Sequence, residues 1–61
     1  MAKKSWYIEN SLALTKAIDE IKANFPCFAD RQLIEMDMSY VQVEAREEDM
    51  PAIERMLAPL M

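Results

Sequence analysis

The residues of this 61-residue chain that are best suited to chemistry are its carboxylates and a single thiol. Glu35, Asp37 and Glu44 alternate with apolar residues, and three carboxylates on one face of a sheet could hold a hard cation such as calcium or magnesium. Calcium sites usually also recruit backbone carbonyls from a tight, often glycine-bearing loop, and the chain has no glycine. We therefore interpret these carboxylates as a solvated sheet face and predict neither a metal site nor a cofactor.

The thiol belongs to Cys27, and the chain contains no histidine. A thiol nucleophile needs a neighbouring base to activate it, and a structural zinc site needs more cysteine or histidine ligands than this sequence has. A glycine-rich phosphate loop is excluded as well. We interpret Cys27 as a small, buried or half-buried thiol and predict that the protein is not an enzyme.

The run Glu47-Glu48-Asp49 fits the first turn of a helix, where the helix dipole favours negative charge. It also extends a candidate acidic patch that could orient a basic protein partner. A net charge of −4 argues against direct nucleic-acid binding, because it repels phosphates. The patch comprises Glu35, Asp37, Glu44, Glu47, Glu48 and Asp49.

The length of the chain predicts one small domain, residues 1–61, of marginal stability. A domain of about 60 residues buries only about 60% of its unfolded surface and usually gains support from disulfides, a metal or another subunit. One cysteine cannot form an internal disulfide. The remaining support is a protein partner, and we expect a second copy of the chain in a homodimer.

The composition also indicates the cellular compartment in which the protein is expected. An apolar content of 52% is too high for a disordered acidic tail, and no apolar run approaches the roughly 20 residues that cross a membrane. Near the start, Trp6-Tyr7-Ile8 is followed at once by Glu9, so the apolar core of a signal peptide is lacking. A lone thiol suits a reducing compartment, and we expect the cytoplasm.

The first half of the chain predicts a strand and a helix. Residues 5–9 are aromatic and β-branched, which is typical of a short strand. Asn10 or Ser11 can cap a helix over 11–25, which Pro26 ends because the residue before a proline avoids helical geometry. The apolar face of this helix comprises Leu14, Ile18, Ile21 and Phe25.

After a connection over 26–32, residues 33–46 predict a hairpin. Apolar and polar residues alternate up to Tyr40, where the alternation shifts by one residue because Val41 is also apolar. A turn centred on Ser39-Tyr40 would place the apolar residues before and after it on the same face of the hairpin. Two-residue turns normally need glycine or asparagine, so a four-residue turn on the same centre is favoured. A single strand with a bulge at Tyr40-Val41, suited to pairing with a second subunit, stays open. The predicted cross-strand pairs are Met38 with Val41, Met36 with Val43 and Ile34 with Ala45.

The last helix starts near Asp49, the predicted cap, and has Pro51 in its first turn. Pro59 ends it near residue 58. Its predicted buried stripe is Ile53, Leu57 and Leu60, with Met50 and Met56 alongside. The predicted fold is a small α+β domain of order β-α-β-β-α, with a three-stranded sheet and both helices packed on one face.

Large apolar side chains remain after this core is filled. Together with the buried stripe, Met50, Met56 and Leu60 give the last helix more apolar surface than one narrow buried stripe needs. Methionine can fill a core, and it can also form an adaptable contact surface for a partner. Trp6 and Tyr7 point to opposite faces of their strand, so one of these frequent interface anchors lies outside the core. The predicted protein interface comprises Trp6, Tyr7, Tyr40, Met50, Met56 and Leu60.

The layout resembles that of the small DinI-like bacterial and phage proteins, which also run strand, helix, break, hairpin and terminal helix. The matching pieces are Ala17-Ile18-Asp19, Phe25-Pro26 and the Glu48-Asp49 helix with Ile53 and Leu57. The acidic, tryptophan-bearing terminal helix of that family has no counterpart here. The resemblance is one of layout, and no functional residue is carried over.

These observations predict a non-catalytic, self-associating protein-binding module that acts as an accessory, inhibitor or adaptor subunit. The alternative is an acidic nucleic-acid mimic, or a phage-type inhibitor of a DNA- or RNA-binding host protein. Ionic strength distinguishes the two, because charge mimicry weakens steeply as salt rises whereas apolar docking does not.

Overall fold

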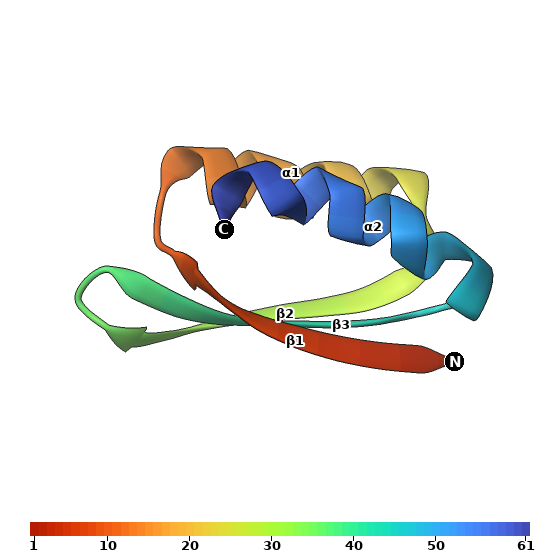
Figure 1. Ribbon diagram of the computed structural model, residues 1–61, viewed down its shortest axis with the longest axis horizontal. Helices are drawn as coiled ribbons and strands as arrows, with labels where there is room; N and C mark the ends of the chain where they lie inside the picture. The colour runs from red at the N-terminus through yellow and green to blue at the C-terminus, as the bar shows by residue number, and fades with distance from the viewer.

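The computed structural model describes all residues, 1–61, and places three strands below two helices (Figure 1). The strand order is β1-β3-β2, and both neighbouring pairs are antiparallel. Both helices lie on one face of the sheet, so the predicted α+β fold is confirmed. The elements are β1 (Ala2–Glu9), α1 (Leu12–Asn24), β2 (Cys27–Glu35), β3 (Met38–Ala45), a 3-10 turn (Glu47–Asp49), α2 (Met50–Leu57) and a final 3-10 turn (Ala58–Leu60).

Strand β1 is an edge strand and is longer than residues 5–9, the predicted range. It starts at Ala2, which pairs with Ala45 at the end of β3, and Lys3 and Lys4 continue the alternation of faces despite their charge. The ammonium group of Lys4 pairs with the carboxylate of Glu54 on α2, which gives a lysine on the helix-covered face a partner. The stem of such a side chain can lie on apolar surface while its charge stays in water.

Helix α1 forms where the apolar spacing predicts it. Ser11, rather than Asn10, is the cap: its Oγ accepts a hydrogen bond from the backbone amide of Leu14 at 3.1 Å. The helix ends at Asn24, followed by Phe25 in an extended conformation before Pro26. Its fully or nearly buried residues are Leu14, Ile18 and Ile21.

The hairpin exists, but its predicted turn is wrong by three residues. The turn lies at Met36-Asp37, and the predicted connection 26–32 belongs mostly to β2. Neither the turn at Ser39-Tyr40 nor the single bulged strand occurs. The observed register instead pairs Cys27 with Ala45, Ala29 with Val43, Arg31 with Val41 and Leu33 with Ser39.

The physical reason for the shift lies at Ser39, which alternation assigns to the polar face. Its side chain is 1% exposed and takes a core-facing position, because Arg31 donates a hydrogen bond to its hydroxyl. Ile34 and Met36, predicted to face the core, lie exposed near the tip of the hairpin. A register irregularity between Leu33 and Glu35 accompanies the turn, and no residue in the chain adopts positive φ.

Helix α2 begins and ends close to the predicted positions. Pro51 lies in the first turn and Pro59 in the 3-10 turn that follows the helix. Asp49 occupies the predicted cap position, but its carboxylate makes no capping hydrogen bond. That carboxylate accepts a hydrogen bond from Arg46 instead.

The core is one cluster between the sheet and the helices. β3 contributes three members because it is the central strand, covered by a neighbour on each side and by helices above. The helices contribute three residues each, and β1 contributes one. The ten buried members are Ile8, Leu14, Ile18, Ile21, Val41, Val43, Ala45, Met50, Ile53 and Leu57.

Candidate functional site

The face of the sheet opposite the helices is covered by no element of the chain (Figure 1). Side chains alternate between the two faces of a strand, so buried and open positions can be assigned along β1 and β3 from the core members Ile8 and Val41. We call this surface the open face. Its residues are Lys3, Ser5, Tyr7 and Glu9 on β1, Phe28, Asp30 and Gln32 on β2, and Met38, Tyr40, Gln42 and Glu44 on β3.

Three aromatic side chains stand on the open face. Tyr7 and Tyr40 are direct cross-strand partners whose ring centroids lie 5.2 Å apart with the planes tilted by 49°. Such a tilted pair is a favourable aromatic geometry. Tyr7 is 65% exposed and Phe28 is 70% exposed, so most of the area of both rings is available to a partner.

Charged residues surround these rings. Cross-strand pairing places Lys3 beside Glu44, and Glu44 beside Phe28. Asp30 and Ser5 both neighbour Gln42. Apolar rings enclosed by polar side chains are the general pattern of a protein contact surface.

Two residues of the predicted interface, Tyr7 and Tyr40, lie together on the open face. Trp6 points to the other face and is half-buried below α2. Met56 and Leu60 are partly buried against the core. Met50 is 4% exposed and belongs to the core, so we remove it from the contact surface.

Sequence reasoning missed Phe28, because it assigned residues 26–32 to a connection between elements. The alternation of Phe28, Asp30 and Gln32 with Cys27, Ala29 and Arg31 is the signal that could have placed it, had 26–32 been read as a strand. The exposed apolar residues of the hairpin tip, Leu33, Ile34 and Met36, were missed because the predicted turn lay three residues too far along the chain.

The predicted acidic patch is divided between the two ends of the sheet. Glu35 and Asp37 lie at the hairpin tip, whereas Glu44 lies near the other end of β3. Glu47, Glu48 and Asp49 follow directly in the 3-10 turn. No group of three or more Asp, Glu, Cys or His side chains is arranged to hold a metal ion.

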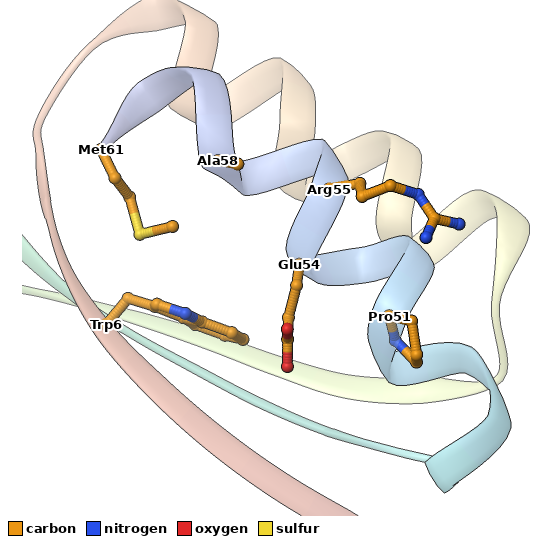
Figure 2. A pocket seen from close by; sticks show the side chains of 6 residues that line it. All are labelled: Trp6, Pro51, Glu54, Arg55, Ala58 and Met61. Atoms are coloured by element: carbon orange, nitrogen blue, oxygen red, sulfur yellow. The ribbon is translucent and has the colours of Figure 1, made fainter.

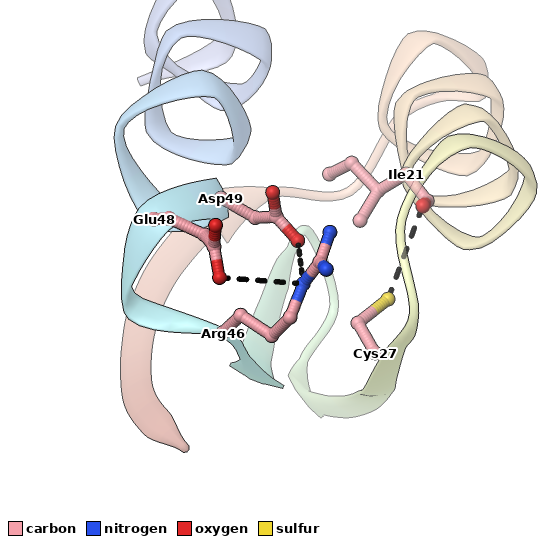
Figure 3. Close-up of polar contacts among 5 residues, drawn as sticks. All are labelled: Ile21, Cys27, Arg46, Glu48 and Asp49. Carbon is pink, nitrogen blue, oxygen red and sulfur yellow. Dashed lines mark hydrogen bonds and ion pairs between the residues drawn. The ribbon is translucent and has the colours of Figure 1, made fainter.

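Arg46 gathers part of this acidic cluster (Figure 3). Its Nε donates a hydrogen bond to Asp49 Oδ2 at 2.8 Å and lies 4.0 Å from Glu48 Oε1. The hydrogen bond and then the charge of Asp49 raise the pKa of Arg46 above its usual value. The Arg46 side chain is half exposed and that of Asp49 is mostly buried, and their contact links the end of β3 to the 3-10 turn before α2. The positive charge of Arg46 reduces the net negative charge there.

The Cys27 thiol is half-buried and its Sγ lies 3.9 Å from the carbonyl oxygen of Ile21 (Figure 3). A carbonyl accepts a weak S–H hydrogen bond and cannot take the proton away as a base. The arrangement agrees with a structural role for this thiol.

A concave feature lies between β1 and α2. It is an open pocket of about 400 Å³, with the indole of Trp6 on one side and residues of the last helix on the other (Figure 2). Its lining is Trp6, Pro51, Glu54, Arg55, Ala58 and Met61.

A polar network ties the hairpin to the start of α1. The guanidinium of Arg31 donates to Thr15 Oγ1 at 2.6 Å, to Asn10 Oδ1, and to Ser39 Oγ at 3.4 Å. The backbone amide of Asn10 donates to the carbonyl of Asp37 at 2.6 Å. Each of the three guanidinium nitrogens of Arg31 has a partner within the chain, so the network positions structural elements.

The fold and its exposed surface define a small α+β domain with one uncovered sheet face. None of its helices has the length and apolar character that crossing a membrane requires. Comparison with protein-family models, curated proteins and solved structures finds no match.

Proposed function

We propose that this protein is a non-catalytic protein-binding module, an accessory, inhibitor or adaptor subunit, and that its contact surface is the open face. The observation that carries this proposal is the exposure of Tyr7 and Phe28 on a sheet face without helices. Aromatic side chains supply large contact area at low entropic cost and are enriched among residues that dominate binding energy.

The charge pattern supports a protein as the occupant. Lys3, Glu44 and Asp30 give the open face both signs of charge close to the rings. A nucleic acid would be repelled by the net charge of −4 and by the carboxylates of Asp30 and Glu44 on this face. A protein partner can bury the rings and leave the charges at a solvated rim.

Binding rather than catalysis is supported by the surroundings of the nucleophilic groups. Cys27 lies against a backbone carbonyl, and the hydroxyl of Ser39 lies among donors and acceptors that are already paired. Neither group has a basic side chain positioned to remove its proton.

The proposal includes self-association and a cytoplasmic location. The core has ten members, and both outer strands leave an edge of the sheet unpaired by the chain. A second copy could cover one of these edges. The single half-buried thiol suits a reducing compartment.

The experiment compares capture of cellular partners by the wild-type chain and by two variants, Phe28→Ser and Tyr40→Ser. Leu12→Ser is the matched control, because Leu12 is an exposed apolar residue at the start of α1. We expect the two open-face variants to lose a partner that the wild type and the control retain, with circular dichroism showing all four folded.

Equal capture by all four chains would contradict the proposed surface. Repeating the capture across a range of salt tests the mechanism of binding. Capture that is lost steeply with salt, and that needs the carboxylates rather than Phe28, would favour the acidic-mimic alternative.

A further inference from the structure

The sheet has two open edges, β1 and β2, because β3 lies between them. An edge strand presents backbone amides and carbonyls that can pair with another strand. The two edges differ in how well their backbones are arranged to pair with a strand of another chain.

The β2 edge is irregular. Its register shifts between Leu33 and Glu35, and the backbone amide of Arg31 donates to the Asp30 carboxylate at 2.9 Å. A bulge and a side chain that occupies a backbone donor are both features that discourage edge pairing.

The β1 edge is regular. Residues 2–9 pair with β3 one by one without a shift. No backbone group of these residues takes part in a hydrogen bond outside the regular elements. Alternate residues of β1 therefore direct their free amides and carbonyls away from β3.

We propose that β1 pairs antiparallel with β1 of a second copy of this chain, with Trp6 at the two-fold axis and Lys3 opposite Glu9 of the other copy. This inference rests on the self-association included in the proposed function and specifies its edge and register. The result is a continuous six-stranded sheet with all four helices on one face.

The register follows from side-chain parity and charge. Directly opposed residues share a face of the sheet. Even-numbered residues of β1 must therefore oppose even-numbered residues of the second copy if the helices of both copies are to lie on the same face. Pairing about Trp6 brings Lys3 against Glu9 of the second copy, and by symmetry this happens twice. Moving the register by two residues places Lys3 opposite Tyr7 in one direction, or Ser5 opposite Glu9 in the other, and the charge pairing is lost.

The pocket beside β1 fits the same arrangement. Trp6 lies on the helix-covered side, and Ala58 and Met61 line the pocket from the end of α2 (Figure 2). At the axis, the indole of each copy would neighbour that of the other, because directly opposed side chains lie about 5 Å apart at Cβ. The exposed thioether of Met61 would then be covered by apolar surface.

The test is a charge swap followed by sedimentation equilibrium of the full chain. Lys3→Glu and Glu9→Lys are made singly and together, and all chains are checked for folding by thermal denaturation. The two residues lie six positions apart on one strand, about 20 Å, so they cannot compensate each other within one chain. Each single change should raise the dimer dissociation constant about tenfold, and the double change should restore it.

Lys16→Glu, Glu20→Lys and their combination are the matched controls. They change net charge by the same amounts on the exposed surface of α1 and should leave the dissociation constant unchanged. If the wild type sediments at 7.1 kDa at its highest concentration, self-association itself fails. If it sediments as a dimer that the Lys3 and Glu9 swaps do not affect, or that the double swap does not restore, only this edge and register are overturned. Neither result alters the Phe28 and Tyr40 capture experiment, which tests the open face.

Discussion

Tyr7 on β1 and Tyr40 on β3 form a tilted ring pair, with centroids 5.2 Å apart, on the face of the sheet that the helices leave open. The pair joins an edge strand to the central strand, and it presents aromatic surface at the same time. One contact therefore contributes to both folding and the proposed binding surface.

Removing the rings one at a time should measure the contribution of the pair to folding. Tyr7→Ala and Tyr40→Ala should each lower the free energy of unfolding by about 1 kcal/mol, and a double-mutant cycle should give a coupling of about 0.5–1 kcal/mol. Urea denaturation measures both quantities. A coupling indistinguishable from zero would mean that the rings touch without stabilising the strand pair.

The last helix should be essential to the fold. Leu57 is fully buried, and Leu57→Asp would place a charge in the core at a cost of more than about 3 kcal/mol. A domain of this size has a total stability of only about 3–9 kcal/mol. We expect a largely unfolded chain by circular dichroism. The control is Leu12→Asp, at an exposed position in the first turn of α1, which should change stability by less than about 0.5 kcal/mol. An unchanged melting curve for Leu57→Asp would show that α2 does not pack on the core.

The Ser11 cap should be measurable on its own. Ser11→Ala removes the acceptor for the Leu14 amide and should destabilise the protein by about 1 kcal/mol. Ser11→Asp keeps an acceptor and adds a charge that suits the helix dipole, so its stability should equal or exceed that of the wild type. Thermal melts of the three chains give the order, and a wild-type melt for Ser11→Ala would show that the cap contributes little.

The Arg31 network should depend on the shape of the guanidinium as well as its charge. Arg31→Met leaves the buried hydroxyl of Ser39 without its donor and should cost about 1–3 kcal/mol. Arg31→Lys retains the charge but cannot reach Ser39, Thr15 and Asn10 together, so it should recover less than half of the loss. Full recovery of unfolding free energy with lysine would reduce the role of Arg31 to charge alone.

The strand β2 shows where prediction from pattern failed and why. Between Cys27 and Gln32 its inward positions include Arg31, and its outward positions include Phe28, so it lacks a clean apolar face. The pattern over Ile34 and Met36 looked more strand-like, yet these residues lie near the hairpin tip and are exposed. Periodicity cannot distinguish an apolar residue that faces the core from one that faces solvent near a turn.

What the sequence determined by itself was local: the helix with Leu14, Ile18 and Ile21 on one face, the stop at Pro26, the proline-started last helix, and the order of elements. These follow from spacing and backbone chemistry within a few residues. The tertiary structure decided the hairpin register, the separation of Glu35 from Glu44, and the burial of Met50 and Ser39. Each of these depends on contacts between distant segments, such as Arg31 reaching Ser39 and Asn10, and no local pattern contains that information.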